Sequence, residues 1–307
     1  MWRGARKRHR AVGWALRALA TALALLLGGG CAFAGGRGST QITIGAVTFS
    51  ENQIVAEMYA QVLEDAGFEV DRRFNFQNRE ALQPAMRSGS IDLSPEYLAS
   101  LLSALDPQAE PSSNPDDNVA KLEPRLEGDG LTLLRPSQAN NTNALVVDSE
   151  TANRLDLAKV SDLEPVASRL TFGGPPECPQ RRFCLQGLRE VYGLRFKKFQ
   201  PLDAGGPLTT AALSSDTVDV ALLFTTSGII AERGWVLLED DRGLQAADNI
   251  TPLIRSDALT DELAQLIDSV SARLTIETMT SLNARVEVRN ENFPAVASDF
   301  LEDEDLI

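Results

Sequence analysis

The sequence predicts an α/β fold made of two similar lobes, each with strands and helices in alternation. Between residues 41 and 94, apolar residues recur at strand spacing and at helical spacing in turn, which is typical of a parallel sheet. Residues 169–224 repeat that alternation. The segments 85–93 and 212–220 also correspond position by position, because each reads as a helix end, a tight turn and a strand with a central aspartate.

The first lobe is expected to begin with a strand and a well-delimited helix. Residues 41–47 alternate as a strand, and Ser50 is a suitable N-cap for the helix that follows. Gly67 is a suitable stop for that helix, since glycine readily takes the left-handed conformation at a helix C-terminus. The next expected elements are a strand at 68–76, a helix at 79–89 and a strand at 90–94.

A polar segment at residues 107–117, rich in proline, serine and aspartate, is expected to be a loop. Trp235 is expected in a strand of the second lobe, and residues 257–307 are expected to be mainly helical. The other expected elements are strands at 131–139, 143–148, 169–174, 194–202 and 218–224, and helices at 185–193 and 207–216.

An aromatic residue closes or follows the corresponding strand of each lobe, Tyr97 in the first and Phe224 in the second. Ligands of open α/β sheets bind beyond the carboxyl ends of the strands. Two lobes that face each other would therefore form a cleft with these two aromatics on its walls, although core packing of both remains an alternative. Pro95 is expected to end the strand before Tyr97, and Glu96 to hold the turn or to face a cationic ligand.

The N-terminal residues have the pattern of an export signal. Six basic residues precede an apolar run at 18–27, and small residues follow at 28–34. We expect a signal peptide at 1–30 and a flexible tether at 31–40, with cleavage before Cys31, which would then carry a lipid. Cleavage after Ala34 is the alternative and would give a secreted or periplasmic soluble protein. An uncleaved anchor helix would need a longer apolar run.

The composition of the exported part argues against two classes of function. All 43 acidic residues remain when the signal is removed, whereas six of the 29 basic residues leave. Such an acidic chain repels the phosphate backbone of nucleic acids. The single histidine, His9, leaves as well, so no Ser-His-Asp or Cys-His arrangement can form. We expect no enzyme; the remaining catalytic alternative would use Glu51 and Glu96 as acid and base.

Cys178 and Cys184 are expected to form a disulfide, because an exported chain folds in an oxidising compartment. The segment that they enclose, CPQRRFC, offers no further metal ligands nearby and lacks the spacing of a zinc site. We therefore expect neither a metal nor a cofactor.

Several segments, taken in order, resemble one family of transport proteins. They are GAVTFSENQIVAEMYAQVLEDAGFEV, SGSIDLSPEY, TFGGPPE, GLREVYGLRFKKFQPLD, VDVALLFTT and VLLEDD. Over residues 41–301 the chain resembles the substrate-binding proteins of osmoprotectant ABC importers, of the glycine betaine, choline and carnitine type. The resemblance implies a two-lobe, periplasmic-binding-protein-like fold of type II, with a ligand cleft between the lobes and two crossover strands. The implied division is lobe 1 at 41–142, lobe 2 at 143–250 and a helical return to lobe 1 at 251–307.

The resemblance also implies solute capture as the function. The protein would close around a small quaternary-ammonium or zwitterionic compatible solute and deliver it to an ABC permease and, through it, to the ATPase. We expect a monomer that a lipid on Cys31 holds at the outer face of the cytoplasmic membrane. A different polar zwitterion, such as an amino-acid derivative, and a sensor that serves no transporter remain alternatives.

The family's cage of aromatic residues around the quaternary ammonium group is only partly present. Such a group has no hydrogen-bond donors, and an aromatic face attracts it through the ring quadrupole. The tyrosine of the family's PEY motif is Tyr97, and the opening of the first helix matches Phe49, Ser50 and Glu51. Asn143 stands where the family commonly has another tyrosine.

The rest of the implied site is more polar than the family pattern. Thr225-Thr226-Ser227 replaces a motif that ends in an acid, and Tyr59 and Tyr192 are expected in the core. The expected cage is therefore Tyr97 with Phe224, helped by Phe49 or Phe172. A more polar ligand is the alternative, and its expected contacts are Asn141, Thr142, Asn143, Thr225 and Thr226.

A ligand carboxylate would need a cation or a set of N–H donors. Arg79, at the start of a helix, is one candidate. Backbone N–H groups at helix N-termini also bind anions, and Ser50-Glu51 and Gly173-Gly174 are the expected places. The two glycines would allow close approach of the backbone, but a turn that requires glycine explains them equally well.

Overall fold

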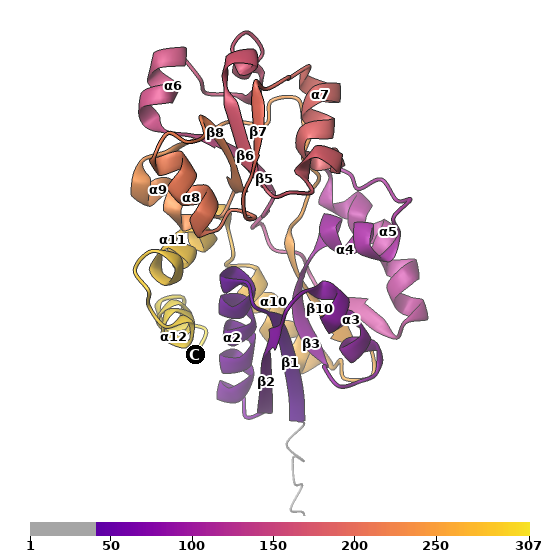
Figure 1. Ribbon diagram of the computed structural model, residues 1–307. Coiled ribbons are helices and arrows are strands. Elements are labelled where there is room, and N and C mark those ends of the chain that lie inside the picture. The colour runs from indigo at the N-terminus through magenta and orange to yellow at the C-terminus, as the bar shows by residue number, and fades with distance from the viewer. Residues whose placement is uncertain (1–40) are drawn as a thin grey trace, which may run out of the picture. The chain divides into compact units, whose positions relative to one another are not determined.

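The computed structural model describes residues 41–307. The expected signal peptide, the tether and the lipid site at Cys31 lie outside these residues. Two five-stranded sheets organise the described chain, and we call the parts built on them lobe 1 and lobe 2 (Figure 1). Within residues 41–307, no helix has both the length and the apolar character that crossing a membrane requires.

The sheet of lobe 1 has the strand order β2-β1-β3-β10-β4. β1 runs parallel to β2 and β3, whereas β10 runs antiparallel to β3 and β4. Its strands are β1 (Gln41–Val47), β2 (Glu69–Phe76), β3 (Leu93–Tyr97), β4 (Leu131–Leu133) and β10 (Ile250–Arg255).

Helices cover both faces of this sheet, as the alternation of β1 requires. Ile42, Ile44 and Ala46 are fully buried in one cluster with α2, α10 and α12, while the adjacent Val47 packs with α3, α4 and α5. A side chain at Gly45 would collide with Leu82 of α3, so that side of the strand accepts a helix at close range. The helices are α2 (Ser50–Asp65), α3 (Arg79–Arg87), α4 (Leu98–Leu105), α5 (Pro115–Gly128), α10 (Asp261–Ser271), α11 (Ile276–Glu287) and α12 (Phe293–Asp303).

Lobe 2 repeats the same plan in the order β7-β6-β8-β5-β9. β6 is parallel to β7 and β8, and β5 is antiparallel to β8 and β9. β8 therefore occupies the place in lobe 2 that β3 occupies in lobe 1, which confirms the predicted similarity of the two lobes. Its elements are β5 (Asn143–Val147), α6 (Ser149–Leu155), β6 (Thr171–Gly174), α7 (Gly187–Tyr192), β7 (Lys198–Pro201), α8 (Pro207–Ser214), β8 (Val220–Phe224), α9 (Gly228–Arg233) and β9 (Val236–Leu237).

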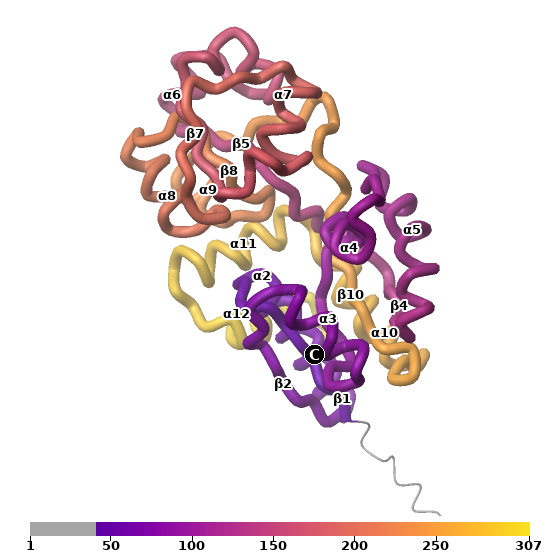
Figure 2. The backbone as a smooth tube through the Cα atoms, turned by 45° about the vertical axis from the view of Figure 1, so that its right-hand side comes forward, coloured from indigo at the N-terminus to yellow at the C-terminus, as the bar shows by residue number. Residues whose placement is uncertain are grey.

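The chain passes between the two sheets twice, after β4 and again before β10 (Figure 2). The two crossover segments pair with each other, since Asn140 and Asn249 form an antiparallel bridge. The N–H of Asn141 also donates to the carbonyl oxygen of Asp248 at 3.2 Å. Two lobes joined by two paired crossovers form the predicted two-lobe α/β fold.

The prediction for residues 90–95 was wrong in one respect. The strand is Leu93–Tyr97 and continues through Pro95 instead of ending there. Pro95 lies opposite Pro252 of β10, and neither residue can donate, so this is a non-hydrogen-bonded pair of the antiparallel ladder. On its other side β3 runs parallel to β1, and the two strands pair at Leu93. Pro95 therefore lies outside the pairing between β1 and β3.

Several element ends also differ from the prediction. The strand expected at 131–139 stops at Leu133, and the strand expected at 194–202 is limited to Lys198–Pro201. Trp235 directly precedes β9 and so lies just outside a strand. Short strands of this kind give few alternating positions, which makes their ends hard to place from sequence.

Candidate functional site

A cleft with a volume of about 950 Å³ lies between the two lobes. Both lobes and both crossover segments contribute to its lining. The lining includes Arg79 and Ser100 of lobe 1, Asn141 and Asp248 of the crossovers, and Asn143, Phe183 and Phe224 of lobe 2. A ligand bound here would contact both halves of the protein, which couples binding to lobe movement.

Tyr97 and Phe224 are the last residues of the equivalent strands β3 and β8. The sequence predicted this strand end for Phe224, whereas it placed Tyr97 beyond a strand that Pro95 ends. Phe224 lines the cleft, and its ring meets the ring of Phe49 edge to face, with centroids 6.0 Å apart. Tyr97 and Phe49 line a smaller hollow of about 180 Å³, and Arg79 lines both spaces. Three of the four predicted cage aromatics therefore gather where the two strands end.

The hydroxyl group of Tyr97 is already engaged. It donates to the Glu51 carboxylate at 3.0 Å. Burial, together with the neighbouring charge of Glu51, raises the pKa of Tyr97 well above its ordinary value, so the phenol stays neutral. The ring of Tyr97 remains partly exposed. Tyr97 thus presents a ring to the hollow and a fixed hydroxyl to the protein.

Glu51 does not face the cleft, which corrects its expected role as a ligand contact. Its side chain is fully buried and accepts hydrogen bonds from Asn141 at 2.7 Å and Asn283 at 2.8 Å, besides the one from Tyr97. Asn283 also donates to the carbonyl oxygen of Thr226 in lobe 2. Burial raises the pKa of Glu51, and these hydrogen bonds oppose the rise. Glu51 therefore joins α2, a crossover and α11 at the junction of the lobes.

Arg79, the expected partner of a ligand carboxylate, is paired with Glu96. Its Nη2 and Nε atoms lie 2.8 Å and 2.9 Å from Oε2 of Glu96, and Gln83 donates to Oε1 at 3.0 Å. The Arg79 side chain is 22% exposed, while that of Glu96 is 4% exposed. Glu96 therefore joins α3 to β3. This corrects the two predictions for Glu96, that it holds a turn or that it faces a cationic ligand.

Other expected contacts are occupied by structural interactions. Thr225 lies behind the lining, where its hydroxyl accepts from the N–H of Thr142 and donates to the carbonyl oxygen of Asn140. Thr226 is buried. At the N-terminus of α2, Ser50 donates to the carboxylate of Glu287 at 2.8 Å, so an acidic group already faces that helix end. These positions correct the predicted ligand roles of Thr225, Thr226 and Ser50.

The stretch Phe172–Gly174 serves packing. Phe172 is fully buried and stacks on Phe196 with ring centroids 4.9 Å apart, so it is no cage residue. A side chain at Gly173 would come within 2.7 Å of Leu202, and Gly174 is buried beside Leu222. Both glycines admit close neighbours inside lobe 2, which corrects the expected anion site. Tyr59 and Tyr192 are buried, as predicted.

Sequence reasoning missed Asp248, which lies in the second crossover and lines the cleft. Its carboxylate accepts from the N–H of Ser100 at 2.9 Å and from the hydroxyl of Ser100 at 2.5 Å. Burial raises the pKa of Asp248, and the hydrogen bonds and the charge of Arg79 oppose the rise. The surrounding sequence, AADNI, has no motif that could have indicated this position.

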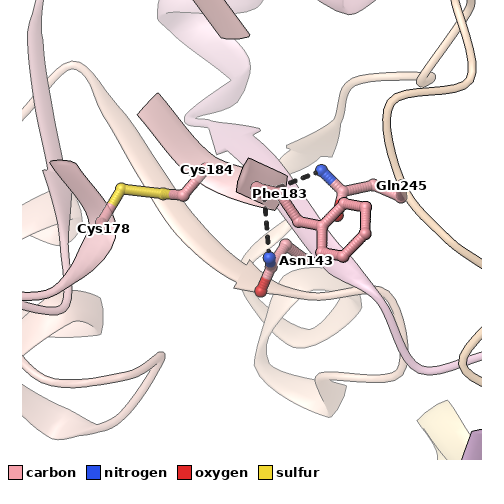
Figure 3. The surroundings of a disulfide bond; sticks show 5 residues. All are labelled: Asn143, Cys178, Phe183, Cys184 and Gln245. Carbon is pink, nitrogen blue, oxygen red and sulfur yellow. Dashed lines mark hydrogen bonds between the residues drawn. A yellow bond between two sulfur atoms is a disulfide. The ribbon is translucent and has the colours of Figure 1, made fainter. Parts of the chain in front are cut away.

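The predicted disulfide between Cys178 and Cys184 is present, and the loop that it closes lines the cleft (Figure 3). Phe183 lies in this loop and was also missed from sequence. Its carbonyl oxygen accepts from Asn143 at 3.0 Å and from Gln245 at 3.1 Å, as Figure 3 shows. Asn143 lines the cleft as expected, but its amide group is used to hold this loop.

Comparison with known proteins identifies the class of this chain. Residues 40–303 match the family described as the substrate binding domain of ABC-type glycine betaine transport systems. A glycine-betaine-binding protein of Pseudomonas aeruginosa is 31% identical, with 95% of each chain covered. The carnitine transport binding protein OpuCC of Listeria monocytogenes is 27% identical, covering 87% of this chain and 88% of the relative.

A solved structure supports the same fold. The crystal structure of a glycine betaine/carnitine/choline ABC transporter protein superimposes with a TM-score of 0.78 at 24% identity, and covers 86% of this chain and 99% of that one. With a family match that spans most of the chain, this protein belongs to the family of substrate-binding domains of ABC-type glycine betaine transport systems.

Proposed function

We propose that this protein captures a small quaternary-ammonium solute of the glycine betaine and choline class in its interlobe cleft and delivers it to an ABC permease. The observation that carries the proposal is that the ring of Phe49 contacts Phe224 of the cleft wall and borders the same small hollow as Tyr97, near the ends of β3 and β8. Aromatic faces stabilise a desolvated quaternary ammonium group by about 0.5–2 kcal/mol each. The name of the relative from Pseudomonas aeruginosa supports the same ligand class.

The cleft also offers a negative group for the cationic end of the ligand. The carboxylate of Asp248 lines it, between Ser100 and the charge of Arg79. Asn141, Thr142 and Asn143 line it as well and can contact the polar end of a zwitterion. We propose that contacts made to both lobes at once favour the closed state and so drive closure.

The remaining parts of the proposal concern the setting of the protein. We propose that it has no enzymatic role, acts as a monomer and passes its solute through the permease of an importer driven by an ATPase. We further propose export by residues 1–30 and a lipid on Cys31 that holds the protein at the outer face of the membrane.

Isothermal titration of the protein, stripped of any bound solute by unfolding and refolding, tests this function. We expect binding of glycine betaine, choline, carnitine or proline betaine. Dimethylglycine is the matched control, because its protonated amine keeps an N–H donor and so loses more hydration on binding; it should bind more weakly. Heat with ergothioneine alone would keep a quaternary-ammonium ligand, since ergothioneine is a trimethylated amino-acid derivative, but would exclude the smaller solutes of the glycine betaine and choline class. No heat with any of these solutes would overturn the proposal.

A further inference from the structure

The loop closed by Cys178 and Cys184 forms a wall of the cleft, and the proposed function assigns no role to this wall. It follows β6 in lobe 2, and the two cysteines together with Arg181, Arg182 and Phe183 line the cavity. A disulfide restricts such a short loop to few conformations. The side chains of the loop are therefore presented to the cleft in a defined arrangement.

Two amide side chains hold the backbone of Phe183 at the cleft wall. Asn143 donates to its carbonyl oxygen from β5, and Gln245 donates to the same oxygen from the segment before β10 (Figure 3). In the β5–β8 ladder Asn143 lies directly opposite Phe224. The loop is thus fixed beside the strand end that carries the aromatic wall of lobe 2.

The ring of Phe183 is partly exposed and already attracts a cation. The guanidinium carbon of Arg182 lies over it, 5.9 Å from the ring centroid. Arg182 also reaches across to Glu110 of lobe 1, with 3.3 Å between Nη1 and Oε1. The Arg182 side chain is half exposed to solvent, whereas the backbone of Phe183 is held by two hydrogen bonds to its carbonyl oxygen.

We propose that Phe183 is a ligand contact of the cleft and supplies an aromatic face beside the start of β5, where Asn143 holds its backbone. In this arrangement Asn143, Gln245 and the disulfide are positioning groups that set the place of the ring. The inference rests on the proposed function, since a ring at this place matters most for a ligand with a quaternary ammonium group.

Titration of glycine betaine and choline into Phe183→Leu and Phe183→Trp tests the contact. Leucine keeps apolar bulk but has no ring, so we expect affinity to fall about tenfold, while tryptophan should keep it. Phe199→Leu is the matched control, because it removes a partly buried ring of the same lobe that packs on Phe172. It should bind like the wild type. Equal affinities of Phe183→Leu and the wild type would overturn the inference.

The positioning role is tested through coupling. Gln245→Met and the double variant Cys178→Ser/Cys184→Ser should each weaken binding in the wild-type background, yet change little once Phe183→Leu is present. Such non-additivity arises when the groups act through the same ring, whereas independent structural effects would add. Additive losses would therefore refute the positioning role.

The outcomes also separate the two proposals. Should the wild-type protein bind no quaternary ammonium solute, the proposed function fails and this inference fails with it. Should the wild type bind while Phe183→Leu binds equally well, the function stands and Phe183 is a packing residue of the loop. Circular dichroism and thermal melts of each variant establish that the compared proteins are folded.

Discussion

Tyr97 makes two contributions that can be separated at the scale of one residue. Its ring borders the hollow beside Phe49, and its hydroxyl donates to a fully buried carboxylate. The ring is available to a ligand, whereas the hydroxyl supports the junction around Glu51. Removal of a hydrogen bond to a charged group costs about 1.5–3 kcal/mol.

We therefore expect Tyr97→Phe to lower the free energy of unfolding by about 1.5–3 kcal/mol with affinity for glycine betaine nearly unchanged. Tyr97→Ala should also weaken binding, by at least tenfold, because it removes the ring. Urea unfolding and titration calorimetry measure the two effects. Equal losses of affinity in both variants would identify the hydroxyl as the ligand contact instead of the ring.

The residues of the site could be predicted from sequence only where a repeated pattern marked them. Tyr97 and Phe224 were found because the two lobes repeat a helix, a turn and a strand before each aromatic. Asp248 and Phe183 lie in irregular segments, so no periodicity indicates where their side chains point. Glu51 was misassigned because its burial depends on Asn141 and Asn283, which are distant in the chain.

At the scale of elements, the ion pair between Arg79 and Glu96 fastens α3 to β3 beside the cleft. Glu96 is nearly inaccessible and has Gln83 as a further donor, so its charge depends on partners within the protein. Removal of one partner from a buried pair is costly, because the other charge then lacks compensation.

Arg79→Met should accordingly lower the free energy of unfolding by about 3–5 kcal/mol. The double variant Arg79→Met/Glu96→Met should recover much of that loss, since no charge is left buried. Arg73→Ala is the control, because Arg73 and Asp71 form an exposed pair whose loss costs less than about 1 kcal/mol. Urea unfolding compares the three. A double variant no more stable than Arg79→Met would contradict this account.

The order and type of most elements were also predictable at this scale, and their ends were not. Long amphipathic helices such as Ser50–Asp65 have enough turns to show their period. The start of this helix was predicted to within one residue, because Ser50 was expected as the N-cap, whereas Phe49 is the N-cap and Ser50 the first helical residue. Strand β3 was shifted because Pro95 was read as a stop, a rule that fails when the proline lies in a non-hydrogen-bonded pair. That pairing is set by β10, a strand more than 150 residues away in the sequence.

At the scale of the whole molecule, the carboxyl group of Glu51 links stability to pH. This group lies where α2, a crossover and α11 meet. Burial raises its folded-state pKa above the ordinary 4.5. The folded state therefore binds a proton more tightly than the unfolded state. This contribution to stability is fully present below pH 4.5 and is lost as the pH rises through the folded-state pKa. Glu64, Asp148 and Asp203 have lowered pKa values and act in the opposite sense, at lower pH.

The free energy of unfolding should thus decrease as the pH rises from 4.5 through the folded-state pKa of Glu51. In this window the sequence contributes a single histidine, His9. Glu51→Gln should be less stable at low pH but should show a flatter dependence, since glutamine does not titrate. Glu64→Gln is the control, because it removes a carboxylate whose pKa is lowered and should leave the slope in this window unchanged. Urea unfolding at several pH values gives the slopes. An identical slope in the wild type and Glu51→Gln would show that Glu51 remains ionised throughout the window, held so by the hydrogen bonds of Asn141, Asn283 and Tyr97.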